Sequence, residues 1–176
     1  MIMRKTAVFF IVMACVMLTM AEQKVVIKDG TPFWYAKMDF QGSFKNMGKN
    51  IGSFMTEFFK QGLQPGGVLM GVYFNNPGEV KEEELKWAIA FPVAKDANVK
   101  ESLKKVEFNR KKVAVYLHIG PYDKLNQAYD KVFKYAKAKG YEIKWPTYDR
   151  YLNNPMQVKP EELKTELIVP LEEVKN

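Results

Sequence analysis

The strongest constraint on the fold of this chain is an internal duplication. Residues 151–164 repeat residues 73–86, and ten of the fourteen aligned positions are identical. The same offset of 78 residues aligns Gly42 with Gly120 without a gap. A match of this quality at a fixed offset indicates that one structural unit occurs twice in the chain.

Each copy has the pattern of a β-α-β-β unit. Apolar residues recur every three or four positions from residue 47 to 58 and again from 125 to 136, which is typical of an amphipathic helix, and a glycine follows each run. Alternating or apolar runs predict strands before and after each helix. We therefore predict one domain over residues 31–172, with repeat 1 at about 33–94, repeat 2 at about 111–172 and a polar linker at 95–112.

Three strands and one helix cannot cover both faces of their own sheet, so the two copies are expected to share one sheet. Joining them edge to edge predicts an α+β fold, namely tandem β-α-β-β units that form a mostly antiparallel sheet. The two helices would lie on one face, and a ligand groove would lie on the other.

The first 21 residues have the layout of a secretory signal peptide. Arg4 and Lys5 precede an apolar run at 7–18, and small residues end at Ala21, where we predict cleavage. Lipidation at Cys15 is the second reading. Either reading predicts an exported protein, periplasmic or extracellular, whose contact with a membrane is limited to the signal peptide or a lipid on Cys15.

Composition excludes several classes of site. Cys15 is the only cysteine, so the chain without residues 1–21 would have no disulfide and no thiolate, and the single histidine, His118, gives poor support for a metal site. We expect no metal and no cofactor. The net charge of +7 comes from dispersed lysines, which indicates a solvated surface and no nucleic-acid partner.

One difference between the copies points to a binding site. Where the first copy has Ala88 in a strand, the second has Glu166. Side chains alternate along a strand, so if Leu167 packs under a helix, Glu166 and Ile168 face the groove. The alternative is a surface glutamate that reaches solvent or pairs with a lysine.

The same alternation supplies the other candidate groove residues. Taking Val113 and Val115 as the packed side of their strand leaves Tyr116 and His118 on the groove side. Aromatic rings are suitable walls for an apolar or cationic ligand. The predicted ligand-binding set is Glu166, His118, Tyr116, Tyr148, Ile168, Met38 and Phe40.

Three motifs carry a resemblance to a known family. His118-Ile-Gly-Pro-Tyr122, Tyr151-Leu-Asn-Asn-Pro155 and the run from Glu161 to Leu171 resemble the GyrI-like small-molecule-binding family, the effector-binding domain of AraC-type and MerR-type regulators. The resemblance implies a groove with a buried glutamate, matched by Glu166. In the regulators that carboxylate attracts cationic, hydrophobic aromatic compounds, whereas some members hydrolyse cyclopropane-bearing compounds.

The combined expectation is a stand-alone, exported binding protein for small hydrophobic, cationic molecules. Only about thirty residues precede the predicted domain, so we expect no helix-turn-helix. The alternative is a hydrolase of cyclopropane-bearing or other strained electrophiles, with Glu166 acting on a water and His118 or a tyrosine as the acid. A haem-binding role is a lesser alternative.

Overall fold

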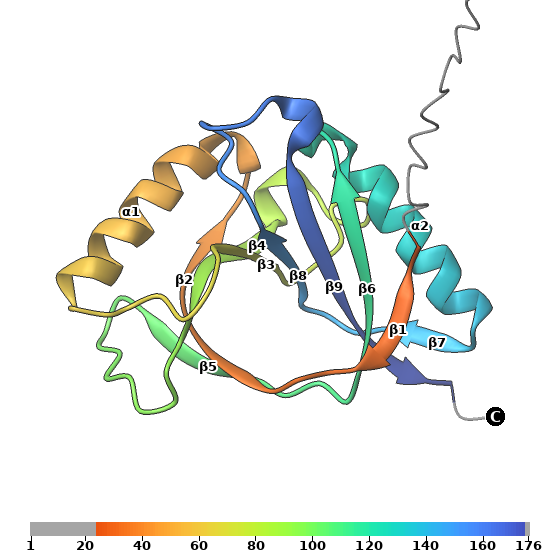
Figure 1. Ribbon diagram of the computed structural model, residues 1–176, viewed down its shortest axis with the longest axis horizontal. Helices are drawn as coiled ribbons and strands as arrows, with labels where there is room; N and C mark the ends of the chain where they lie inside the picture. Colours follow the sequence, from red (N-terminus) through yellow and green to blue (C-terminus); the bar gives the residue numbers. More distant parts are fainter. Residues whose placement is uncertain (1–23, 175–176) are drawn as a thin grey trace, which may run out of the picture.

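The computed structural model describes residues 24–174 and has the α+β architecture expected from the duplication (Figure 1). The elements of the two units follow the same order at the same offset. The first unit comprises β2 (Phe33–Gln41), α1 (Met47–Lys60), β3 (Met70–Tyr73) and β4 (Lys86–Val93). The second comprises β6 (Lys112–Ile119), α2 (Leu125–Ala138), β8 (Thr147–Tyr151) and β9 (Lys164–Glu173).

Short elements complete the described chain. They are the strands β1 (Val26–Asp29), β5 (Lys104–Phe108) and β7 (Tyr141–Ile143), and the 3-10 turns η1 (Phe44–Asn46), η2 (Glu82–Glu84), η3 (Tyr122–Lys124) and η4 (Pro160–Glu162). Strand β5 corrects the expectation that residues 95–112 form only a linker. It pairs with β2, and its Phe108 is buried.

The predicted signal peptide, including Cys15 and Ala21, lies outside the described residues. Between residues 24 and 174, no helix has the length and apolar character needed to cross a bilayer.

Local sequence explains where the two helices end. Gly62 and Gly140 follow α1 and α2 with φ angles of 72° and 81°, in the left-handed region that favours glycine. Each helix buries one stripe, which includes Phe54 and Phe58 in α1 and Val132 in α2.

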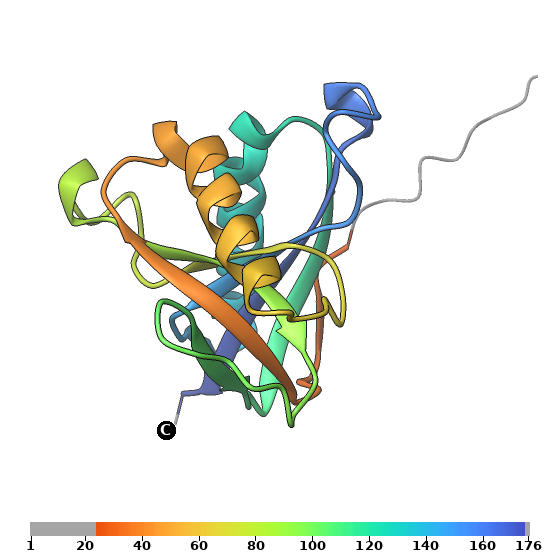
Figure 2. The same ribbon diagram turned by 90° about the vertical axis from the view of Figure 1, so that its left-hand side faces the viewer.

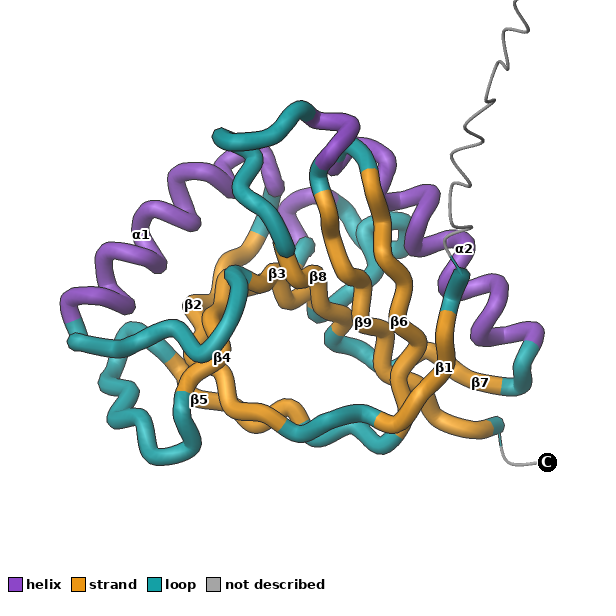
Figure 3. Tube along the Cα trace, viewed as in Figure 1, coloured by secondary structure: helices purple, strands orange, loops and turns teal. Residues whose placement is uncertain are grey.

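The sheet joins the two units at their inner edges. Its strand order is β1-β6-β9-β8-β3-β4-β2-β5, with β7 paired to β9, and the strand pairs are antiparallel (Figure 3). Strands β3 and β8 meet at the centre, where Gly71 is the register partner of Asp149. This β3–β8 seam is the boundary between the two units, which are related by pseudo-twofold symmetry.

Both helices lie on the same side of the sheet (Figure 2). Trp87, Ile89 and Phe91 of β4 pack in one core with Phe54 and Phe58 of α1. Leu167 and Val169 of β9 pack in another with Ala128 and Val132 of α2. The expected packed sides of β4 and β9 are therefore confirmed.

The expected facing of β6 is reversed in the structure. Ala114 and Tyr116 pack under α2, whereas Val113 belongs to a core on the opposite face of the sheet. That opposite face is filled because the ends of the sheet curve toward each other (Figure 3). Tyr35 and Phe108 from one end meet Tyr148 from the seam, with ring centroids 6.0 Å and 5.1 Å apart.

Candidate functional site: a pocket between the two helices

A large cavity in the described part of the chain lies on the helix side of the sheet, between α1 and α2, with a volume of about 1240 Å³. The sequence predicted a groove on the opposite face, which side chains fill instead. The two units meet at the β3–β8 seam, so their helices lie on either side of it. The pocket occupies the space between those helices.

The two long walls of the pocket differ in chemistry. Met47, Ile51 and Met55 of α1 form an apolar wall, which Leu69 and Phe91 extend. The wall that faces it comes from η3 and α2 and carries both aromatic and polar side chains. These are Tyr122, Asp123, Asn126, Tyr129, Asp130 and Phe133.

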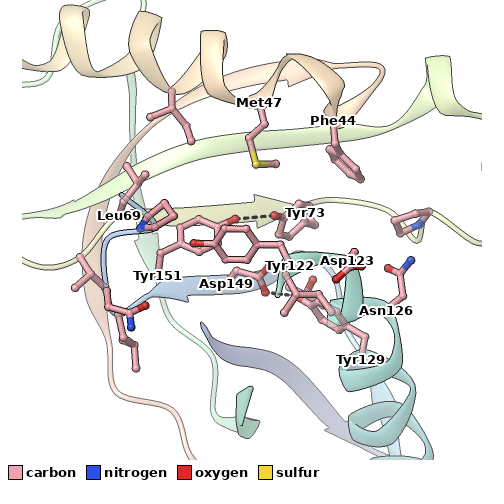
Figure 4. Close-up of a pocket in the computed structure, with 18 of the residues that line it drawn as sticks. Phe44, Met47, Leu69, Tyr73, Tyr122, Asp123, Asn126, Tyr129, Asp149 and Tyr151 are labelled. Carbon is pink, nitrogen blue, oxygen red and sulfur yellow. Dashed lines mark hydrogen bonds between the residues drawn. The ribbon is translucent and has the colours of Figure 1, made fainter. Parts of the chain in front are cut away.

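A buried carboxylate lies at the floor of the pocket. Asp149 of β8 is 1% exposed, and its Oδ1 accepts a hydrogen bond of 2.6 Å from the Tyr129 hydroxyl. Beside it, the hydroxyl oxygens of Tyr73 and Tyr151 are 2.9 Å apart and share a hydrogen bond across the seam. Figure 4 shows the four side chains converging beneath Met47 and Phe44.

Burial determines the protonation of the Asp149 carboxyl and the Tyr129 hydroxyl at the pocket floor. Desolvation raises the pKa of Asp149 to about 7, against the opposing effect of the hydrogen bond from Tyr129. Burial, reinforced by the nearby Asp149 carboxylate, raises the pKa of the Tyr129 hydroxyl, which therefore stays protonated as a donor. At neutral pH Asp149 is thus close to its titration midpoint, where a nearby cation would favour the charged form.

No cationic side chain of the described chain lines the pocket. Its charged lining residues are Asp123, Asp130 and Asp149, although Lys and Arg together number 27 in the sequence. Residues 24–174 contain no group of three or more His, Cys, Asp or Glu side chains that could hold a metal ion. The pocket lining thus combines a largely apolar surface with a few acidic groups.

The residues predicted from the sequence lie elsewhere. Glu166 is on the opposite face, where Arg150 donates to it a hydrogen bond of 2.7 Å and forms an ion pair. Ile168 and Tyr148 belong to the core of that face. Glu166 is therefore paired with an arginine of the neighbouring strand β8, whereas the alternative considered from the sequence was a lysine or solvent.

The remaining predicted residues are also separate from the pocket. Tyr116 is buried under α2, and His118 Nε2 lies 3.2 Å from the Pro121 carbonyl oxygen. Met38 and Phe40 pack at the margin of the core beneath α1. None of the seven residues lines the pocket between the helices, so a ligand role for them on other surfaces stays a prediction.

Sequence reasoning missed Asp149, although the signal was present. At the offset of 78 residues, Asp149 aligns with Gly71, which is as large a chemical difference as that between Ala88 and Glu166. Gly71 is required where it lies, because a Cβ there would be 2.7 Å from the Tyr73 hydroxyl oxygen and 2.8 Å from that of Tyr151. The sequence alone does not say which of these two differences between the copies marks the pocket, because that depends on the position of the helices relative to the seam.

Comparison with known protein families identifies one family for this chain. The model of the GyrI-like small molecule binding domain matches residues 23–172, which is most of the chain. The chain belongs to the GyrI-like family. Its members' description as a small-molecule-binding domain applies to the region that contains the pocket and Asp149. No curated protein gives a significant match to the sequence.

Solved structures share the GyrI-like fold at low sequence identity. The C-terminal domain of EcmrR matches with a TM-score of 0.72 and 19% identity, covering 87% of this chain and 99% of that domain. A hydrolase from Listeria innocua matches with a TM-score of 0.62 and 14% identity, over 85% and 92% of the two chains. SAV2435 bound to tetraphenylphosphonium matches with a TM-score of 0.55 and 14% identity, over 85% and 94%.

Proposed function

We propose that this GyrI-like domain binds small hydrophobic cations in the pocket between α1 and α2. The observation that carries the proposal is the buried Asp149 carboxylate, which lies in an aromatic and apolar pocket that no cationic side chain of the described residues enters. Burying a charge without a counter-ion is costly, and a ligand cation would supply that counter-ion.

The rest of the pocket suits the apolar part of such a ligand. Tyr73, Tyr122 and Tyr151 offer ring faces and edges near the carboxylate, and Met47 and Met55 offer flexible apolar surface on the other side. The structure of SAV2435 holds tetraphenylphosphonium, a hydrophobic cation, and this supports the same ligand class for the present chain.

Two isosteric variants test the proposal. Asp149→Asn should weaken the binding of a cationic aromatic dye such as ethidium roughly thirtyfold or more, because the buried counter-charge is lost. Glu166→Gln removes one carboxylate on the opposite face and should leave the affinity unchanged. Fluorescence titration of both variants measures this, and the sequence-based expectation for Glu166 predicts the reverse pattern. Equal affinity of Asp149→Asn and the unmodified protein would exclude the proposed site.

A hydrolytic activity is the second candidate. Asp149, with its pKa raised by burial to about 7 and a hydrogen bond to Tyr129, has the properties of a general base beside a proton donor. One structure with the same fold is described as a hydrolase from Listeria innocua. Incubation with cyclopropane-bearing electrophiles should then give a hydrated product that Asp149→Asn does not form, and the absence of product over a broad panel would remove this candidate.

We also propose that the protein is exported. The support is the layout of residues 1–21, with basic residues, an apolar run and small residues before Ala21. Mass spectrometry of the protein from its own cells should find Glu22 at the N-terminus, in a periplasmic or extracellular fraction. A lipid-modified Cys15 in the membrane fraction would support the lipoprotein reading, and an intact N-terminus would contradict both.

A further inference from the structure

The acidic character of the pocket comes entirely from the second unit. Asp123, Asn126 and Asp130 lie along η3 and α2 with spacings of three and four residues, so they share one face toward the pocket. At the offset of 78 residues, the first unit has Lys45, Gly48 and Gly52 in these places. The two units therefore share one fold, but only the second has carboxylates on its wall of the pocket.

Neither carboxylate at the pocket mouth has an ion-pair partner among the described residues. Asp123 and Asp130 are exposed. Asp123 precedes α2, where a negative charge stabilises the helix N-terminus. Asp130 lies in the middle of α2, where the helix dipole gives no such explanation. In a chain with a net charge of +7, helix stability accounts for Asp123 but not for Asp130, which lies in the same pocket.

A second observation points to a ligand in the same pocket. Thr147 lines the pocket floor on the same strand as Asp149 and is 1% exposed. Its Oγ1 makes no well-formed hydrogen bond in the described part of the chain and interacts only with the neighbouring Tyr129 hydroxyl. A buried polar group without a partner is costly. The pocket floor therefore has both a carboxylate and a hydroxyl available to an occupant.

The pocket is large, and its acidic residues lie in two separate places. A volume of about 1240 Å³ exceeds the range of roughly 300–1,000 Å³ that is usual for drug-sized ligands. Asp149 is buried at the floor, whereas Asp123 and Asp130 are exposed at the rim (Figure 4 shows Asp123). The apolar wall from Met47, Ile51 and Met55 runs along the same pocket.

We infer that the ligand carries two cationic groups joined by an apolar body. One group lies against Asp149 at the floor, and the other lies at the mouth near Asp123 and Asp130. The apolar body between them contacts the α1 wall. This inference rests on the proposed function, because it assigns a second charge to a ligand whose first charge is held by Asp149.

The test compares ligands that differ by one charge. Decyltrimethylammonium and decamethonium have the same ten-carbon chain, with one and two trimethylammonium groups. Isothermal titration calorimetry at low salt should find that decamethonium binds about three- to tenfold more tightly, as expected for one or two exposed ion pairs. In the double variant Asp123→Asn/Asp130→Asn this advantage should disappear, so that the ratio of the two affinities falls to about one.

A charge-matched control separates a local contact from the net charge. Asp96→Asn/Glu107→Gln also removes two exposed carboxylates, both outside the pocket, and should keep the decamethonium advantage. If decamethonium binds no better than the monocation, or the advantage survives in Asp123→Asn/Asp130→Asn, the two-charge inference is wrong. If the monocation itself binds independently of Asp149, the proposed function fails, and the inference fails with it.

Discussion

Asp149 and Gly71 occupy equivalent positions in the two units and lie opposite each other across the β3–β8 seam. The difference between glycine and aspartate at these positions has a steric and an electrostatic consequence. Gly71 leaves the space that the Tyr73 and Tyr151 hydroxyls fill, and Asp149 places a single carboxylate beside them. An acid at both positions would bring two buried like charges together, which would raise at least one pKa further.

The pH dependence of stability follows from Asp149. Its pKa is raised from 3.8 to about 7 in the folded protein, so between these values the folded state binds more protons than the unfolded state. This carboxyl therefore lowers the free energy of unfolding as the pH rises from about 4 to about 7, by roughly 4 kcal/mol in total, and its contribution is constant above that range. Urea denaturation of the unmodified protein and of Asp149→Asn across this range measures the contribution.

The variant supplies the control for this prediction. Since asparagine does not titrate, the difference in unfolding free energy between Asp149→Asn and the unmodified protein should increase toward higher pH. A difference that is independent of pH would mean that the pKa of Asp149 is the same in the folded and unfolded states.

At the scale of elements, β3 and β8 decide the shape of the pocket floor. The two strands are short, and on the pocket side of the sheet they pair Gly71 with Asp149 and, at the end of β3, Tyr73 with Thr147. The hydroxyls of Tyr73 and Tyr151 meet beside Gly71, where a Cβ would lie within 3 Å of both. The helices differ in a corresponding way, because α1 has Gly48 and Gly52 where α2 has Asn126 and Asp130.

Gly71→Ala should destabilise the protein by about 1–3 kcal/mol, since the added methyl would contact both tyrosine hydroxyls at less than 3 Å. Gly48→Ala is the matched control, because a Cβ there meets nothing within 4 Å and alanine favours the helix, so this variant should be stabilised by up to about 1 kcal/mol. Thermal or urea denaturation measures both effects.

A rescue variant tests the physical reason. Removing one hydroxyl with Tyr151→Phe should relieve part of the cost of Gly71→Ala, so the effects of the two substitutions would not be additive. Strict additivity would show that the methyl group and the Tyr151 hydroxyl do not compete for the same space.

At the scale of the whole molecule, the curvature of the sheet links the two units. The core on the face opposite the helices combines Tyr35 and Phe108 from the first half with Tyr148 and Ile168 from the second. The helix-side cores, in contrast, belong to one unit each. The face on which a ligand groove was predicted from the sequence therefore contains the core that holds the two units together.

This shared core predicts a single cooperative unfolding transition. Amides of β4 in the first unit and of β9 in the second should exchange with the same free energy of global opening, because opening either half removes the core that the two halves share. Native-state hydrogen exchange in low urea measures both sets. Protection of β9 after β4 has opened would show instead that the two units unfold independently.

The sequence by itself determined the α+β class, the two units, and both helices with their terminal glycines. These features depend on local periodicity and on the repeat, which are written in consecutive residues. The strand β5 was missed because it lies in a polar stretch and has only two apolar residues beside Lys104, Lys105 and Glu107. The correct facing of β4 and β9 followed from the bulk of their side chains, whereas β6 has branched residues on one side and Tyr116 on the other.

Only the tertiary structure decided which carboxylate lies in the pocket. Both Asp149 and Glu166 are acids in strands of the second unit, and their immediate sequences do not tell them apart. The curvature of the sheet fills one face with Tyr148 and Ile168 and leaves Glu166 beside Arg150. The separation of α1 and α2 opens the other face over the seam, where Asp149 is desolvated and bound to Tyr129. Burial and charge at a residue depend on neighbours from distant parts of the chain, and the fold alone brings those neighbours together.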